Sequence, residues 1–88
     1  MELKIASRTV TDEQGRHRRY HYSVLVDQIE SGNFACEDYG VQIREEGGDC
    51  AMVSSITTSA MRIDELMTLL VDNKVGPTTL GDVVADWL

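Results

Sequence analysis

The sequence predicts an α+β fold in which a four-stranded antiparallel β-meander is covered on one face by two C-terminal helices. Two patterns predict it: turn residues separate β-rich segments up to about residue 58, and apolar residues then recur at helical spacing. Because both helices follow the strands, they must cover one sheet face together. The chain has 88 residues and 42% apolar content, which is enough for one domain, residues 1–88, with a thin core.

Four segments are expected to be strands, at about residues 2–11, 16–30, 34–45 and 49–57. Turn signals lie between them at residues 12–15, at residues 31–33 and at Gly47-Gly48, which is typical of a two-residue hairpin loop.

Closing hairpins at these turns places Ile5 opposite Tyr22, Val24 opposite Val41, and Ile43 opposite Met52. Tyr39 then lies opposite Ile56, and one face of the sheet collects nearly all the apolar strand residues: Leu3, Ile5, Tyr20, Tyr22, Val24, Val26, Tyr39, Val41, Ile43, Met52 and Ile56. A slip of one residue in any hairpin would scatter this set over both faces. The agreement between the three hairpins favours the meander.

Two helices are expected at about residues 59–73 and 78–88, with Thr58 or Ser59 as the first N-cap. Gly76 and Pro77 separate them, since proline cannot continue a helix but can begin the next one. Each helix has one apolar stripe. The stripes are Ile63, Leu66, Met67, Leu70 and Val71 in the first helix, and Leu80, Val83, Val84, Trp87 and Leu88 in the second. Trp87 and Leu88 are expected to close the core as a lid.

The net charge is −7, and residues 31–88 carry all of it, since the charges of residues 1–30 balance. An acidic protein repels phosphate backbones and anionic lipid, which argues against a nucleic-acid or membrane partner. The N-terminus has no apolar signal region, and no apolar run is long enough to cross a bilayer. We therefore expect a cytoplasmic protein.

The chain also resembles a family of short, uncharacterised proteins from Gram-positive anaerobic bacteria. Three pieces carry the resemblance: Tyr20-x-Tyr22, Asp38-Tyr39-Gly40-Val41, and the closing segment Val75-x-Pro77-x-x-Leu80-x-Asp82-Val83-Val84-x-Asp86-x-Leu88. The resemblance implies a family with no assigned activity, so it implies no functional residues.

The segment Arg16–His21 is the one concentrated basic run. Its Arg16, Arg18, Arg19 and Tyr20 could bind an anionic ligand or nucleic acid, because arginine contacts phosphate through paired donors. Two structural interpretations stay open beside this one. The run could be a solvated hairpin edge that discourages aggregation, or it could pair with the acidic half of the same chain.

Nothing in the sequence predicts a catalytic, metal or cofactor site. His17 and His21 lie about 13 Å apart along a strand, too far to bind one ion together. Cys36 and Cys50 fall on distant parts of the ladder, and we expect them to be reduced, packed cysteines. No Ser/His/Asp or Cys/His set and no phosphate-binding glycine loop accompanies the carboxylates. We therefore predict a protein that is not an enzyme.

The sheet face away from the helices is expected to be small or apolar at its centre, with charge at its margins. Its central residues would be Ser23, Leu25, Gly40, Gln42, Val53 and Ser55. A solvated sheet face usually carries more lysine, glutamate and threonine. The leading hypothesis is therefore a small non-catalytic module that binds a protein partner or a second copy of itself through this face or through an edge strand. The alternative is anion or nucleic-acid binding at the basic run.

Overall fold

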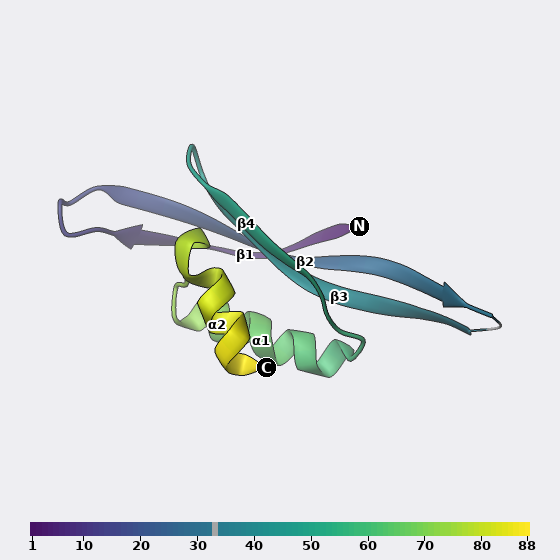
Figure 1. Cartoon of the computed structure of the whole chain (residues 1–88). Coiled ribbons are helices and arrows are strands. Elements are labelled where there is room, and N and C mark those ends of the chain that lie inside the picture. The colour runs from purple at the N-terminus through teal and green to yellow at the C-terminus, as the bar shows by residue number, and fades with distance from the viewer. Residues whose placement is uncertain (33) are drawn as a thin grey trace.

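The computed structural model describes residues 1–32 and 34–88 and confirms the predicted α+β meander. The strands are β1 (Glu2–Thr11), β2 (His17–Ser31), β3 (Phe34–Glu45) and β4 (Cys50–Thr57), and they form one antiparallel sheet in the order β1-β2-β3-β4. Both helices lie on one side of this sheet (Figure 1). Asn33, in the turn predicted at residues 31–33, lies outside the described residues.

The helices are α1 (Ala60–Asp72) and α2 (Leu80–Trp87), preceded by the short 3-10 turn η1 (Pro77–Thr79). Ser59 caps α1, because its Oγ accepts a hydrogen bond from the backbone nitrogen of Arg62 at 3.2 Å. The prediction that Trp87 and Leu88 close the core is correct for Trp87 and wrong for Leu88. Trp87 packs against the core beneath the Arg62 guanidinium, 4.3 Å from the ring centre. Leu88 lies beyond the helix and is 74% exposed.

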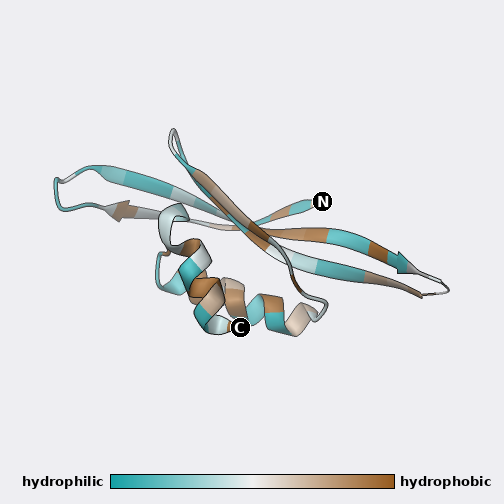
Figure 2. Cartoon of the chain, in the orientation of Figure 1, coloured by the Kyte–Doolittle hydropathy of each residue, from teal (hydrophilic) through white to brown (hydrophobic). Residues whose placement is uncertain are grey.

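The core lies between the two helices and the middle of the sheet. All five stripe residues of α1 are buried, and so are Leu80 and Val84 of α2. The sheet contributes Tyr22, Val24, Val26, Val41 and Ile43. Figure 2 shows hydrophobic residues gathered where the sheet passes over the helices, while the tip joining β1 to β2 is mainly hydrophilic. Burial of this apolar surface provides most of the driving force for folding.

The β2–β3 register is the predicted one, with Val24 opposite Val41 and Tyr22 opposite Ile43. The β1–β2 register is correct at Leu3 but wrong at Ile5, because Ala6 lies opposite Tyr22. The loop of this hairpin has three residues, closed by the Asp12 nitrogen on the Arg16 oxygen at 2.9 Å. A bulge at Ile5 takes up the extra residue and leaves its side chain 52% exposed.

The predicted β3–β4 register is wrong by one residue. Ile43 lies opposite Ala51 instead of Met52, because the loop again has three residues, 46–48, with Gly47 at a φ of 73°. A one-residue shift moves every side chain to the other face. Met52 is therefore 60% exposed on the side away from the helices, and Val53 packs against the core.

A second bulge, in β4, lies opposite Gly40. Val41 pairs with Val53 but Tyr39 pairs with Thr57 instead of Ile56, so β4 has two extra residues here, and Ser55 has a φ of 55°. The backbone of β4 lies so close to Gly40 that a Cβ there would be 2.4 Å from the Val53 oxygen. Glycine is therefore required at this position. The bulge also turns Ile56 back toward the core.

The molecule is long and thin, with principal extents of 54 × 24 × 17 Å. Pairing with β1 ends at Val26, and pairing with β4 ends at Tyr39. Residues 27–31 and 34–38 therefore pair only with each other, and we call this two-stranded extension the arm. In Figure 1 the arm extends away from the helices on one side, and the β1–β2 hairpin extends on the other.

Candidate functional site

The sheet has one face that no other element of the described chain covers, which we call the outer face. Its residues alternate along the strands with the core residues that face the helices. They include Lys4, Arg19, His21, Ser23, Leu25, Asp27, Ile29, Cys36, Asp38, Gly40, Gln42, Arg44, Cys50 and Met52.

Four of the six predicted interface residues lie on the outer face: Ser23, Leu25, Gly40 and Gln42. The placement of Val53 is wrong, since the shifted register turns it toward the core. Ser55 is exposed within the β4 bulge. Met52 replaces Val53 as the apolar residue of β4 on this face. A two-residue loop at Gly47-Gly48 would have placed Met52 on the helix side, and the three-residue loop reverses this.

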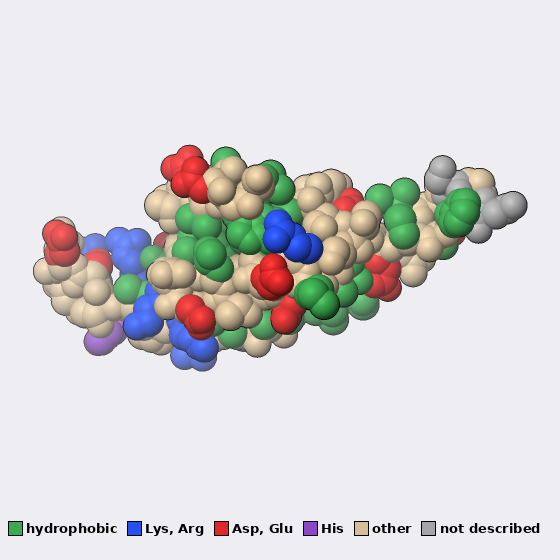
Figure 3. Space-filling model, turned by 90° about the horizontal axis from the view of Figure 1, so that it is seen from below, with side chains coloured by type: hydrophobic (Ala, Val, Ile, Leu, Met, Phe, Trp, Pro, Cys, Tyr) green, Lys and Arg blue, Asp and Glu red, His purple; other side chains and the backbone are tan. Residues whose placement is uncertain are grey.

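The ionic groups of the outer face are separated along its length. On one side of Leu25, toward the β1–β2 hairpin, lie Lys4, Arg19 and Arg44, and on the other side Asp27 and Asp38 lie at the start of the arm. No lysine or arginine occurs between residues 20 and 43. Seen from the helix side, Figure 3 also shows blue Lys and Arg side chains over the β1–β2 end and none on the arm. Glu46 also lies at the basic end, against Arg19 and His21, but it offsets only one of the three positive charges there. The two halves of the outer face therefore carry opposite net charge.

Asp38 is the unusual group of this face, because it is only 7% exposed and lies directly opposite another carboxylate, Asp27. Neither aspartate forms an ion pair within the described part of the chain. Like charges that face each other across strands are destabilising. No buried carboxylate oxygen in the described residues lacks a hydrogen-bond partner, so the Asp38 oxygens stay open to solvent and to an incoming cation. The structure thus contains an acidic pair without a partner.

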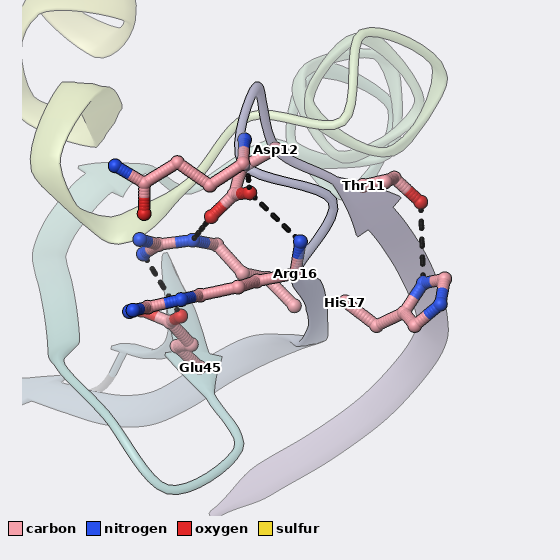
Figure 4. A network of polar contacts seen from close by, with 7 residues as sticks. Thr11, Asp12, Arg16, His17 and Glu45 are labelled. Atoms are coloured by element: carbon pink, nitrogen blue, oxygen red, sulfur yellow. Dashed lines mark hydrogen bonds and ion pairs between the residues drawn. The ribbon is translucent and has the colours of Figure 1, made fainter.

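The basic run is engaged with carboxylates of its own chain. Arg18 contacts Asp12 Oδ2 at 3.3 Å through Nε and Glu45 Oε1 at 3.1 Å through a terminal nitrogen (Figure 4). The hydrogen bond from the Arg16 backbone nitrogen, with further help from Gln14 and Arg18, lowers the pKa of Asp12. The hydrogen bond to Asp12 in turn raises the pKa of Arg18.

Arg19 and Tyr20 lie on opposite faces of β2, and Tyr20 shares the helix side with Arg18. Arg19 lies 3.7 Å from Glu46, which also contacts His21 at 3.2 Å. Tyr20 is half-buried on the helix side, where its hydroxyl lies beside Gly76. The structure therefore places Arg19 on the opposite face from Arg18 and Tyr20, and it pairs Arg18 and Arg19 with acids of the same chain.

The described surface has several hollows, of which two lie beside β1. A cleft of about 190 Å³ between β1 and α1 is lined by Ile5, Ala6, Arg8, Asp64, Met67, Thr68, Val71 and Asp72. A shallower hollow of about 360 Å³ at the β1–β2 hairpin is lined by Thr9, His17, Arg19 and Glu46. In residues 1–32 and 34–88 no three His, Cys, Asp or Glu side chains converge to hold a metal ion.

The histidines and cysteines make no shared site. His17 lies 3.2 Å from the Thr11 hydroxyl, and His21 lies 3.0 Å from the Ser7 hydroxyl. Cys36 and Cys50 are both free, as expected, but the expectation that they pack inside the protein is wrong, because both are exposed.

The comparisons with known proteins give one result. A family model described as a family of unknown function (DUF6514) matches residues 1–88, which confirms the expectation of an uncharacterised family. No curated protein and no solved structure matches. Among the described residues, no helix has the length and apolar character needed to cross a membrane.

Proposed function

We propose that this chain, which belongs to the DUF6514 family of unknown function, is a non-catalytic protein-interaction module that docks through the outer face of its sheet. The observation that carries the proposal is the asymmetry of the two faces. Helices cover one face, while the other presents a small and apolar centre and an acidic pair without a cation. Exposed apolar groups beside unpaired charge are typical of a binding surface.

The face is a better docking surface than either edge of the sheet. Both edge strands contain a bulge, at Ile5 in β1 and at residues 54–56 in β4. Bulges at edges interrupt the row of free backbone groups and hinder the addition of another strand. The outer face has no such obstruction, and Ser23 and Gly40 at its centre leave room for close approach.

The absence of catalysis is part of the proposal. The cleft between β1 and α1 brings together one arginine, two aspartates and a threonine, but no histidine, cysteine or lysine. On the outer face His21 lies between the Ser7 hydroxyl, at 3.0 Å, and the Glu46 carboxylate, at 3.2 Å, but neither Ser7 nor His21 lines the hollows described above, so this set has no substrate pocket beside it there. In the basic run, Arg18 and Arg19 are held by Asp12, Glu45 and Glu46. These ion pairs also weigh against anion binding there.

A cytoplasmic location and a source in Gram-positive anaerobic bacteria complete the proposal. The acidic composition, with a net charge of −7, supports the location. Cell fractionation with an antibody against the chain tests it: the protein should appear in the cytosolic fraction, and recovery from the membrane or the medium contradicts the proposal.

The chain offers a matched pair of methionines for testing the docking face. Met52 is 60% exposed on the outer face, and Met61 is 74% exposed on α1 in the helix layer. A photoreactive amino acid is introduced at either position in the cells that make the protein. We expect protein cross-links from position 52 and few from position 61. Equal yields from the two positions, or no cross-links from position 52, contradict docking through this face.

A further inference from the structure

We propose that the partner of the outer face is a second copy of the chain, stacked face to face with its strands running antiparallel to those of the first. This inference rests on the proposed function and names its partner. The two copies are related by a twofold axis that lies between the two sheets. The axis runs perpendicular to the strands, at the level of the paired residues Val24 and Val41 in the middle of the sheet.

Charge complementarity selects this arrangement. A half-turn about that axis exchanges the two halves of the face, so the aspartates of each copy approach the basic half of the other. On β3, Asp38 and Arg44 lie three residues to either side of Val41, so each Asp38 faces the Arg44 of the other copy. On β1, Glu2 and Lys4 exchange places in the same way. Each attractive contact occurs twice because the interface is isologous.

The two groups that the half-turn joins both lack a partner in the single chain. Asp38 is nine-tenths buried and faces Asp27, and Arg44 is exposed and forms no ion pair in residues 1–32 and 34–88. A guanidinium placed over two carboxylates forms strong charge-assisted hydrogen bonds. The second copy thus neutralises the acidic pair that the single chain leaves uncompensated.

The centre of the face fits a sheet-on-sheet contact. Leu25 and Met52 supply apolar surface, and Ser23 and Gly40 are small enough for two twisted sheets to approach to about 10 Å. A parallel stack would place aspartates over aspartates and Arg44 over Arg44, which is repulsive. Of the two face-to-face orientations, only the antiparallel one is attractive at both ends.

Charge exchange tests the arrangement. Sedimentation velocity at high micromolar concentration should show wild-type dimers, whereas Arg44→Glu and Asp38→Lys should each weaken dimerisation at least about tenfold. An equimolar mixture of the two variants should restore a dimer that contains one copy of each, because both end contacts become attractive again. Lys74→Glu and Asp86→Lys make the same changes of charge in the helix layer and should dimerise like the wild type.

Circular dichroism establishes that each variant is folded, and Asp27→Lys replaces Asp38→Lys in the mixture if the latter does not fold. If the mixture of the two variants does not form a dimer, the antiparallel arrangement is overturned. A wild-type monomer at this concentration overturns self-association altogether. In that case cross-links from position 52 to another protein would leave the docking function standing, so the two proposals can fail separately.

Discussion

The hydroxyl of Tyr22 donates a hydrogen bond to the backbone carbonyl of Val75 at 2.9 Å, and the two residues lie 53 positions apart in the chain. The bond joins the central strand β2 to the loop between the two helices, and it is fully buried. It therefore fixes the end of α1 and the start of η1 against the sheet. Tyr20 supports the same loop through its contact with Gly76.

Replacing Tyr22 with phenylalanine should destabilise the fold by about 1–3 kcal/mol, because the buried Val75 carbonyl loses its donor while the ring stays in place. Urea denaturation followed by circular dichroism measures the change. Tyr39→Phe is the matched control, because the Tyr39 hydroxyl bonds only the exposed Glu37 carboxylate. An equal effect of both substitutions contradicts a special role for the bond to Val75.

The stability should also fall at high pH through Tyr22. Burial raises the pKa of Tyr22 from 10.0 to about 12. Above pH 10 the unfolded chain loses the phenolic proton while the folded chain keeps it, so the free energy of unfolding decreases as the pH rises toward 12. The loss reaches about 3 kcal/mol at most. Denaturation at about pH 9 and about pH 12 tests this, and the decrease should be smaller in Tyr22→Phe.

Gly40→Ala should destabilise the domain by at least about 2 kcal/mol, since its Cβ would lie 2.4 Å from the Val53 oxygen and the clash is with backbone. Gly81→Ala is the opposite control. Nothing lies within 4 Å of a Cβ at Gly81, which is in α2, so alanine there should stabilise by about 0.5–1 kcal/mol. Thermal denaturation of the two variants compares them, and a neutral Gly40→Ala contradicts the close approach of β4.

The neighbouring residues Met52 and Val53 test the register of β4. Val53→Asp places a carboxylate against the core and should cost about 3 kcal/mol or more, whereas Met52→Asp should change the stability of the dilute monomer by less than about 1 kcal/mol. The measurement is chemical denaturation at low micromolar concentration. If Met52→Asp destabilises the protein more than Val53→Asp does, the register of β4 is the one expected from a two-residue loop.

The parts of the fold that follow from regular periodicity could be predicted from the sequence. The α1 stripe and the β2–β3 ladder have no insertion, so a constant period of 3.6 or 2 places each side chain correctly. The β4 register could not be predicted in this way. Gly47-Gly48 fits a two-residue loop as well as the three-residue loop that forms, and Ser55 gives no glycine signal for its left-handed backbone.

The candidate site was predictable in its position but not in its electrostatics. The alternation of β2 and β3 places Ser23, Leu25, Gly40 and Gln42 on the outer face. The acidic pair could not be predicted from the sequence. The low exposure of Asp38 and its position opposite Asp27 follow only from the packed sheet. Likewise, the sequence left open whether the basic run pairs with acids of its own chain, because Asp12, Glu45 and Glu46 come beside Arg18 and Arg19 only when the turns form.

The exposed cysteines allow the most direct measurement of antiparallel self-association. Within one chain Cys36 and Cys50 are about 26 Å apart, since Cys50 pairs with Arg44, eight residues along β3 from Cys36. In the antiparallel dimer Cys36 of one copy lies near Cys50 of the other. A short bismaleimide is added to an equimolar mixture of Cys36→Ser and Cys50→Ser, and to each variant alone. We predict cross-linked dimers in the mixture and few in either variant alone. Efficient cross-linking of either variant with itself, or none in the mixture, would contradict the antiparallel dimer.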